Sequence, residues 1–116
     1  AEPFINGVAS LVRHIEERHL TNIRIWDDDV RLILGGLESG SLAGAYVLFP
    51  DPWPKTRWKK HRILQAPFLH LLYRKLLPEG FVSYKTDHAQ YFEETLQLVK
   101  EEFSKFFLDL NFYIYL

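Results

Sequence analysis

A short run of cations and aromatic rings is the part of this sequence best suited to binding chemistry. Residues 49–62 read F-P-D-P-W-P-K-T-R-W-K-K-H-R, and five of the last eight carry a fixed positive charge: Lys55, Arg57, Lys59, Lys60 and Arg62. Such cations meet phosphates, while flat rings such as Trp53 and Trp58 can stack on unpaired bases. The composition of the run is therefore typical of a nucleic-acid site. A solvated loop, in which the tryptophans prop the backbone against the core, explains it equally well.

The charge of the whole chain favours a local site for a polyanion. The chain has 14 Lys and Arg against 15 Asp and Glu, so it is close to neutral. Without the five cations of the run, nine basic residues stand against 15 acidic ones. A cationic patch on an anionic body favours a local polyanion site over binding to a membrane surface.

The prolines of the run constrain its backbone. Pro50, Pro52 and Pro54 lack the backbone N–H group that a β-ladder needs, and each favours extended backbone in the residue before it. The apolar segment that precedes them should therefore end as a strand at Phe49. Asp51 lies between two of the prolines, in what we expect to be a stiff, extended loop.

Length and composition limit the protein class. At 116 residues the chain holds at most one domain, and 47% hydrophobic residues are enough for a packed core. It has no cysteine, which excludes disulfides and thiolate metal sites, and its five histidines show no metal-like pairing. No run of about 18 apolar residues and no signal peptide is present. We therefore expect a cytoplasmic protein that binds neither a metal nor a membrane.

Helices and short apolar strands alternate along the chain. Helical periodicity predicts helices over residues 4–19, 30–34, 63–77 and 89–103. Strand signals cover residues 23–26, 43–49 and 81–86, and residues 106–116 should form one or two more strands. In the last helix the predicted core-facing stripe consists of Phe92, Leu96, Val99 and Phe103. This alternation predicts an α/β fold with a largely parallel sheet.

Acidic residues follow each of the first three predicted strands. Residues 27–29 are three aspartates after the first strand, Asp51 follows the second, and Asp87 follows the third. In an open parallel sheet, ligands bind beyond the carboxyl ends of the strands, and these acids fall at that edge. Each acid alone is more often a helix cap or turn residue, but the three together predict a binding site.

The loop and its basic tail also resemble a known family. The string F-P-D-P-W-P-K followed by a basic tract is similar, nearly residue for residue, to a motif of the tRNA (guanine-N7)-methyltransferases. The resemblance extends from Glu2 to the predicted helix that ends near Phe103. It implies a Rossmann-like class I methyltransferase sheet with helices on both faces. It also implies transfer of a methyl group from S-adenosylmethionine to N7 of a guanine in the variable loop of tRNA.

The resemblance implies roles for single residues. Glu2 would bind the ribose hydroxyls of the cofactor, and Asp29, or else Asp28, would lie near its adenine. Asp51 corresponds to the catalytic acid and is counted among the cofactor contacts as well. The residues that would bind the tRNA substrate are Lys55, Asp87, Arg57, Lys59, Lys60 and Arg62.

Two elements of the family pattern are missing. The glycine-rich loop that approaches the methionine part of the cofactor should precede Glu2, and no G-x-G occurs in the 116 residues. A T-x-[FY]-E element expected near the carboxyl end is also absent. We therefore expect one partial methyltransferase domain over residues 1–116, incomplete on its N-terminal side. This polypeptide alone should bind the cofactor weakly or not at all.

Two other functions fit parts of the sequence. An enzyme on the same scaffold could methylate another base or a small molecule, although the basic tract argues against a small neutral substrate. A catalytically inactive relative that binds RNA or acts as a scaffold would explain the missing glycine-rich loop. The sequence leaves the choice between a monomer and a homodimer open.

Overall fold

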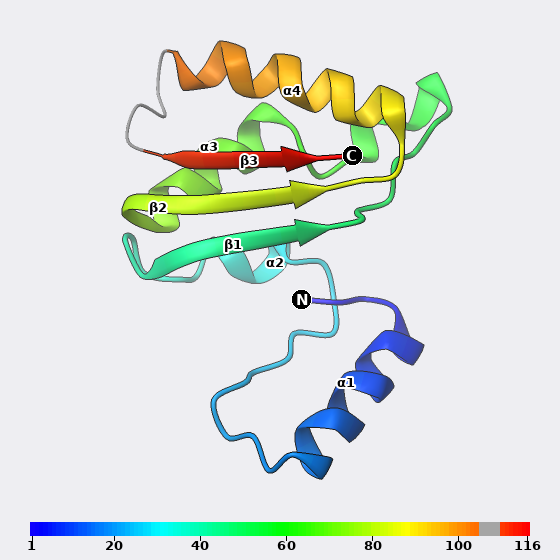
Figure 1. Cartoon of the computed structure of the whole chain (residues 1–116), viewed down its shortest axis with the longest axis vertical. Coiled ribbons are helices and arrows are strands. Elements are labelled where there is room, and N and C mark those ends of the chain that lie inside the picture. Colours follow the sequence, from blue (N-terminus) through cyan, green and yellow to red (C-terminus); the bar gives the residue numbers. More distant parts are fainter. Residues whose placement is uncertain (105–109) are drawn as a thin grey trace. The chain divides into compact units, whose positions relative to one another are not determined.

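The computed structural model describes residues 1–104 and 110–116, apart from the side chain of Phe103. The chain divides into two compact units, Ala1–Leu37 and Glu38–Leu116. Figure 1 labels the four α-helices and three strands of the described residues, coloured from blue at the N-terminus to red at the C-terminus. No helix in the described ranges is both long and apolar enough to span a bilayer.

The first unit contains a long helix, an irregular segment and a short helix. α1 spans Ile5–Glu17 and carries its apolar residues at helical spacing. Just after it, His19 takes the left-handed conformation with φ of 52°, and the N–H of Leu20 donates to the carbonyl of Ile15 (3.1 Å). α2 spans Arg31–Leu34 and confirms the short helix predicted over residues 30–34.

The predicted strand at residues 23–26 is wrong. Ile23 and Ile25 are β-branched, which produced the prediction, but the segment has no ladder partner among the described residues. The carbonyl of Trp26 instead accepts a hydrogen bond from the N–H of Glu2 (2.9 Å). An extended segment becomes a strand only when a neighbouring segment pairs with it.

A three-stranded parallel sheet forms the centre of the second unit. β1 spans Leu42–Leu48, β2 Leu76–Lys85 and β3 Asn111–Tyr115, in the order β1-β2-β3. α3 (Ala66–Lys75) connects β1 to β2, and α4 (Ala89–Phe103) connects β2 to β3. The short 3-10 helix η1 (Thr56–His61) lies between β1 and α3 in the chain. Parallel strands joined by helices confirm the predicted α/β class (Figure 1).

The core of this unit lies on one face of the sheet. Val82 and Tyr84 of β2 are completely buried there, and the ring centroid of Tyr84 lies 5.5 Å from that of Tyr91 in α4. The other face carries Tyr46 of β1 and Tyr113 of β3, which pair in register with the same residue of β2 and remain 70% and 49% exposed. Considered by itself, the second unit therefore has a sheet with one covered face and one open face.

α3 is shorter than its predicted range of 63–77. It begins at Ala66 because Pro67 stands in its first turn, where the fixed φ of proline suits a helix start. It ends at Lys75, and Leu76 enters β2 directly with extended backbone. Residues 78–80 belong to β2, and among them Glu79 has left-handed backbone with φ of 61°.

α4 has the predicted bounds but turns a different face to the core. The buried residues are Tyr91, Thr95 and Val99, whereas Phe92 and Leu96 of the predicted stripe are only half-buried. Tyr91 is favoured inside because its ring packs on Tyr84 while its hydroxyl still finds a partner. The side chain of Phe103 in this stripe, and residues 106–109 of the predicted C-terminal strands, lie outside the described residues.

One glycine permits the pairing of β1 with β2. The register jumps from Leu42 opposite Leu76 to Gly44 opposite Phe81, so β2 carries extra residues between the two pairs. A Cβ atom at Gly44 would lie 2.1 Å from Cε1 of Phe81. The Phe81 ring can lie against β1 in this way only because residue 44 has no side chain.

Candidate functional site

β1 delivers a sharply bent loop to the carboxyl edge of the sheet. The N–H of Phe49 donates to the carbonyl of Lys85 (2.8 Å), so the ends of β1 and β2 lie side by side. Phe49 and Trp53 have left-handed backbone, with φ of 50° and 42°. Each such residue costs about 1–3 kcal/mol and persists only where the surroundings hold it. The bends therefore depend on contacts made elsewhere in the unit.

Asp51 stands between the two bends with an exposed side chain. Its Oδ1 accepts a hydrogen bond from the N–H of Trp53 (3.0 Å), which makes an Asx turn and orients the carboxylate. Asp87 follows β2 and is exposed as well. Since β1 and β2 are parallel neighbours, the structure brings Asp51 and Asp87 to the same edge of the sheet.

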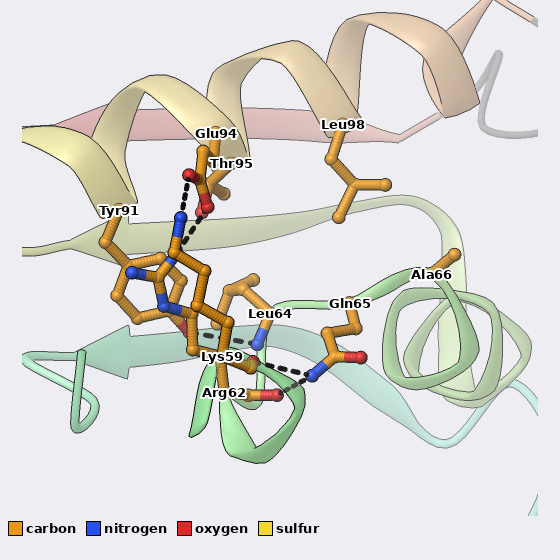
Figure 2. A pocket seen from close by; sticks show the side chains of 9 residues that line it. All are labelled: Lys59, Arg62, Leu64, Gln65, Ala66, Tyr91, Glu94, Thr95 and Leu98. Carbon is orange, nitrogen blue, oxygen red and sulfur yellow. Dashed lines mark hydrogen bonds and ion pairs between the residues drawn. The ribbon is translucent and has the colours of Figure 1, made fainter. Parts of the chain in front are cut away.

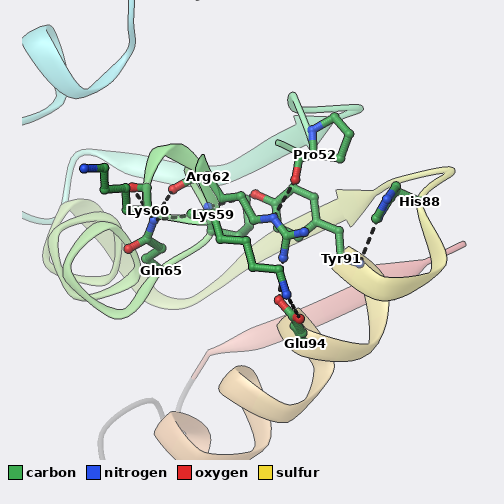
Figure 3. A network of polar contacts seen from close by, with 9 residues as sticks. Pro52, Lys59, Lys60, Arg62, Gln65, His88, Tyr91 and Glu94 are labelled. Carbon is green, nitrogen blue, oxygen red and sulfur yellow. Dashed lines mark hydrogen bonds and ion pairs between the residues drawn. The ribbon is translucent and has the colours of Figure 1, made fainter. Parts of the chain in front are cut away.

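The buried side chain of Arg62 holds this loop in place. Its side chain is only 4% exposed, and its Nε donates to the carbonyl of Pro52 (2.5 Å). Its Nη1 donates to Oε2 of Glu94, and its guanidinium carbon lies 4.7 Å from the centroid of the Tyr91 ring. Figure 3 shows these contacts, which link the loop after β1 to the first turns of α4.

The other cations of the tract are placed differently. Lys59 is half-buried, and its Nζ donates to Oε1 of Glu94 (2.9 Å). Lys60 is exposed at the surface. Lys55 and Arg57 are exposed too, and their charged groups lie 4.8 Å and 4.6 Å from the ring centroid of Trp58. Three of the five predicted phosphate contacts therefore face water.

The two tryptophans of the run pack on each other. The ring centroids of Trp53 and Trp58 are 6.1 Å apart in an edge-to-face arrangement, and His61 lies 5.0 Å from Trp53. Both indoles are half-buried. These contacts support the interpretation of the tryptophans as props for the loop, because edge-to-face packing already occupies part of their ring surface.

A cavity of about 250 Å³ lies between η1 and α4, with the Arg62–Glu94 pair in its wall (Figure 2). Gln65, one of the lining residues, donates to the carbonyls of Lys60 (2.8 Å) and Arg62 (2.7 Å). These hydrogen bonds provide partners for the carbonyls at the end of η1. Nη2 of Arg62 has no hydrogen-bond partner among the described residues. The residues that line the cavity are Lys59, Arg62, Leu64, Gln65, Ala66, Tyr91, Glu94, Thr95 and Leu98.

The electrostatics of this wall favour a permanent ion pair. The hydrogen bond from Lys59, together with the nearby charge of Arg62, lowers the pKa of Glu94 against the effect of desolvation. Burial raises the pKa of Tyr91 to about 12. Glu94 is therefore ionised and Tyr91 neutral throughout the physiological range.

α4 starts at a well-defined cap next to Asp87. Nδ1 of His88 accepts a hydrogen bond from the N–H of Tyr91 (3.1 Å), and the N–H of His88 donates to the hydroxyl of Thr86 (3.1 Å). His88 thus serves as the N-cap of α4. The cap fixes the turn of α4 that carries Tyr91.

The first unit holds the remaining predicted site residues. The N–H of Glu2 binds the carbonyl of Trp26, and the indole N–H of Trp26 donates to the carbonyl of Asp29 (2.8 Å). Trp26 therefore brings Glu2 and Asp29 together within this unit. The Glu2 carboxylate accepts from the N–H of Phe4 (2.9 Å) and is exposed.

Asp28 and Asp29 both already have partners. Both carboxylate oxygens of Asp29 accept from Nε of Arg31 (3.0 Å), and this side-chain hydrogen bond lowers the pKa of Asp29. The backbone N–H of Arg31 also binds Oδ1 of Asp29 (2.9 Å), which is capping chemistry at the start of α2. Oδ1 of Asp28 accepts from the N–H of Asp29 (2.6 Å).

Sequence reasoning missed Tyr91 and Glu94 as parts of the site. The pattern of α4 assigned Glu94 to the solvated face, and 32 residues separate it from Arg62. No local spacing reports a contact over that distance. The one available signal was Arg62 itself, which needs a counter-charge if the loop buries it.

Known proteins that are similar to this chain are methyltransferases. A family model described as "Putative methyltransferase" matches residues 2–111. The tRNA (guanine-N(7)-)-methyltransferase of Neorickettsia sennetsu is 45% identical over 105 residues, which is 90% of this chain and 48% of the relative. That of Caulobacter sp. is 44% identical over 99 residues, or 85% of this chain and 44% of the relative. A "Bifunctional methyltransferase" of Rickettsia typhi is 38% identical over 100 residues, which is 86% of this chain and 19% of the relative.

The chain spans about half the length of the first two of these relatives. The family model nevertheless covers nearly the whole chain, including the F-P-D-P-W-P-K loop and the strands β1 and β2, and it ends at the first residue of β3. The family resemblance inferred from that loop is thereby confirmed. The chain belongs to this family of methyltransferases.

Proposed function

We propose that the protein is a cytoplasmic enzyme that transfers a methyl group from S-adenosylmethionine to N7 of a guanine in the variable loop of tRNA. The observation that carries the proposal is the exposed carboxylate of Asp51 at the carboxyl edge of a parallel sheet, followed directly by a cationic tract. The names of the similar proteins from Neorickettsia sennetsu and Caulobacter sp. support tRNA as the substrate and N7 as the acceptor atom.

The reaction requires little acid–base catalysis by the protein. Guanine N7 has an in-plane lone pair and no proton, so no general base is needed at the attacking atom. The cofactor, when bound, supplies an electrophilic methyl group on a sulfonium. The protein's main task is then to align the guanine, and alignment of this kind can supply roughly 7–11 kcal/mol in favourable cases.

Asp51 is suited to hold the guanine. An ionised carboxylate has two acceptor oxygens, which match the N1–H and the exocyclic amino group of guanine, and adenine lacks this pair of donors. The same negative charge would offset the positive charge that grows on the purine as N7 is methylated. Either role requires a carboxylate that is exposed and fixed in direction, as the Asx turn of Asp51 provides.

The tRNA backbone would lie along the cationic tract. Lys55, Arg57 and Lys60 are exposed and available to phosphates, and Lys59 becomes available once it leaves Glu94. Asp87, on the same edge as Asp51, would make a second substrate contact. Arg62 was also expected to contact the tRNA, but its guanidinium is bound to Pro52 and Glu94, so we leave it out of the phosphate-binding set.

The adenosine part of the cofactor would lie against the first unit. The Glu2 carboxylate is a paired acceptor that suits two vicinal ribose hydroxyls, and its exposure leaves it accessible. Asp29, or else Asp28, offers a carboxylate to the adenine amino group. These acceptors fit the adenosine, whereas no glycine-rich loop for the methionine part occurs in the 116 residues.

The test is methyl transfer to unmodified tRNA by the full-length protein and its Asp51→Asn variant. We expect the parent to form 7-methylguanosine in the variable loop, detected by nucleoside mass spectrometry. Asp51→Asn should lose most turnover, at least a hundredfold, and should keep its tRNA affinity within threefold.

Two results would contradict the proposal. Tight tRNA binding without any methylation by the parent would favour the inactive RNA-binding relative. A loss of tRNA affinity in Asp51→Asn as large as the loss of turnover would show that Asp51 binds the RNA without a role in the reaction.

A further inference from the structure

We propose that Arg62 and Glu94 are positioning residues for Asp51. They fasten the loop that carries the carboxylate to α4, and the guanidinium of Arg62 does not contact RNA phosphates. The inference rests on the proposed role of Asp51 in methyl transfer and adds the means by which the fold keeps that carboxylate in place.

The loop cannot be fastened in the way a strand is. Three of the five residues from 50 to 54 are prolines, so only Asp51 and Trp53 have a backbone N–H. The N–H of Trp53 is used inside the loop, on the carboxylate of Asp51. The N–H of Asp51 and the carbonyls are left as points of attachment, and the carbonyls need a donor from elsewhere in the chain.

Arg62 supplies that donor at the middle of the Asx turn. Its Nε donates to the carbonyl of Pro52, the residue between Asp51 and Trp53. Arginine carries five N–H groups on a rigid plane and accepts no hydrogen bonds, so one side chain can bind a carbonyl and a carboxylate at once. The peptide between Pro52 and Trp53, whose N–H binds the carboxylate of Asp51, is thereby attached to a buried group.

α4 holds the guanidinium in turn. Glu94 accepts from Nη1, and the ring of Tyr91 lies against the guanidinium at 4.7 Å. A cation that is 4% exposed requires such a counter-charge, because desolvation without one is strongly unfavourable. The hydroxyl of Tyr91 also accepts from the buried N–H of Leu64 (3.0 Å), so the chain just after Arg62 is fixed to the same turn of α4.

The same contacts exclude Arg62 from phosphate binding. Its charge is buried and already neutralised by Glu94, whereas Lys60, two residues earlier, faces water. The remaining group, Nη2, has no hydrogen-bond partner among the described residues but is buried as well, so a phosphate could reach the guanidinium only if its surroundings moved. The basic tract therefore divides into exposed cations for the RNA and one buried cation for the loop.

The first test compares Glu94→Gln with Glu93→Gln in the full-length protein. Glu93 is exposed and adjacent on α4, so both variants lose the same charge in the same helix. We expect Glu94→Gln to lower kcat for tRNA methylation at least tenfold with KM for tRNA within threefold, and Glu93→Gln to stay within twofold of the parent on both. Equal kinetics of the two variants would overturn the proposal.

A double-mutant cycle shows whether the effect passes through Asp51. In an Asp51→Asn background, Glu94→Gln should change the residual turnover by less than threefold, because no carboxylate remains to be positioned. A loss of the same size in both backgrounds would mean that Glu94 acts in another way, and the proposal would fail.

The salt dependence of tRNA binding distinguishes a positioning role of Arg62 from a contact with RNA phosphates. Arg62→Gln should leave the slope of log Kd for tRNA against log salt unchanged, while Lys60→Gln should flatten it by about one unit. Equal flattening by both would assign Arg62 to a phosphate and refute the proposal. If Arg62→Gln does not fold, Arg62→Lys decides instead, since it keeps the charge and should show the loss of kcat seen for Glu94→Gln.

Hydrogen exchange at the Trp53 amide reports on the loop without any turnover. We expect Glu94→Gln to speed that exchange at least tenfold and Glu93→Gln to leave it unchanged. Unchanged exchange in Glu94→Gln would overturn the positioning role even if kcat fell. Conversely, if Asp51→Asn keeps full turnover, the proposed role of Asp51 fails, and the exchange result still decides whether Arg62 and Glu94 hold the loop.

Discussion

Nζ of Lys59 lies 2.9 Å from Oε1 of Glu94, whose second oxygen binds Arg62, so one carboxylate serves two cations of the basic tract. A phosphate that recruits Lys59 must first replace this carboxylate. Lys59 should therefore release fewer counterions on RNA binding than an exposed lysine does.

This difference predicts unequal salt effects for two neighbouring lysines. Lys60→Gln should reduce the slope of log Kd for tRNA against log salt by about one unit, whereas Lys59→Gln should reduce it by less than half of that. Filter binding or fluorescence anisotropy of labelled tRNA between about 50 and 200 mM salt measures both slopes. Equal changes would mean that Lys59 leaves Glu94 at no cost and acts as a free cation.

The N-cap of α4 predicts a second, purely structural effect. His88→Ala removes the acceptor for the N–H of Tyr91 and should lower the free energy of unfolding by about 1 kcal/mol. His88→Asn should keep most of that stability, because asparagine is a good N-cap. Gln90→Ala, at an exposed position in the same turn, is the control and should not destabilise the protein. Urea unfolding of the four proteins decides the ranking.

Gly44 predicts a steric effect at the β1–β2 pair. Gly44→Ala places a Cβ 2.1 Å from Cε1 of Phe81, so the ring or the strand must move, at a cost of about 1–3 kcal/mol. Gly35→Ala has no atom within 4 Å of its new Cβ and should be neutral or slightly stabilising. Thermal unfolding distinguishes the two. A Gly44→Ala protein as stable as Gly35→Ala would contradict the observed register.

The lowered pKa of Glu94 predicts a loss of stability in acid. A carboxyl group whose pKa is depressed in the folded state stabilises that state above its unfolded pKa, and this contribution is lost as the pH falls through the folded value. The difference in unfolding free energy between the parent and Glu94→Gln should therefore be constant near neutral pH. It should shrink as the pH falls below the ordinary value of 4.5. Urea titrations from pH 7 to about pH 3 test this, and a pH-independent difference would argue against the ion pair.

Local patterns in the sequence were sufficient for the class of the fold and for the position of the loop. The expected extended conformation of the loop was wrong, because Phe49 and Trp53, each directly before a proline, have left-handed backbone. Helical periodicity located α4, the three prolines placed the end of β1 near Phe49, and the spacing of acids placed Asp51 and Asp87 at one edge of the sheet. These features depend on residues within one element or one turn. The same patterns overestimated α3 and produced a strand at residues 23–26, because propensity does not report whether a partner strand is present.

The contacts that hold the loop of the candidate site in place could not be predicted from local patterns. Arg62 looked like a surface cation, and only the folded chain shows it bound to Pro52 and Glu94. Burial of a charge depends on long-range packing, here between the loop after β1 and α4. The one signal in the sequence, the need of a buried Arg62 for a counter-charge, does not identify Glu94 as the partner. The different roles of the five cations could therefore not be predicted.

The open face of the sheet has a consequence for handling the polypeptide. Tyr46, Leu48, Tyr113 and Tyr115 are 70%, 58%, 49% and 51% exposed there, which makes a wetted aromatic surface on a parallel sheet. Such a surface takes up hydrophobic dyes and adsorbs to plastic and resins. It also promotes reversible clustering when kosmotropic salts such as sulfate strengthen apolar contact. The 116-residue chain should therefore be colloidally least stable under the salting-out conditions often used for concentrating proteins.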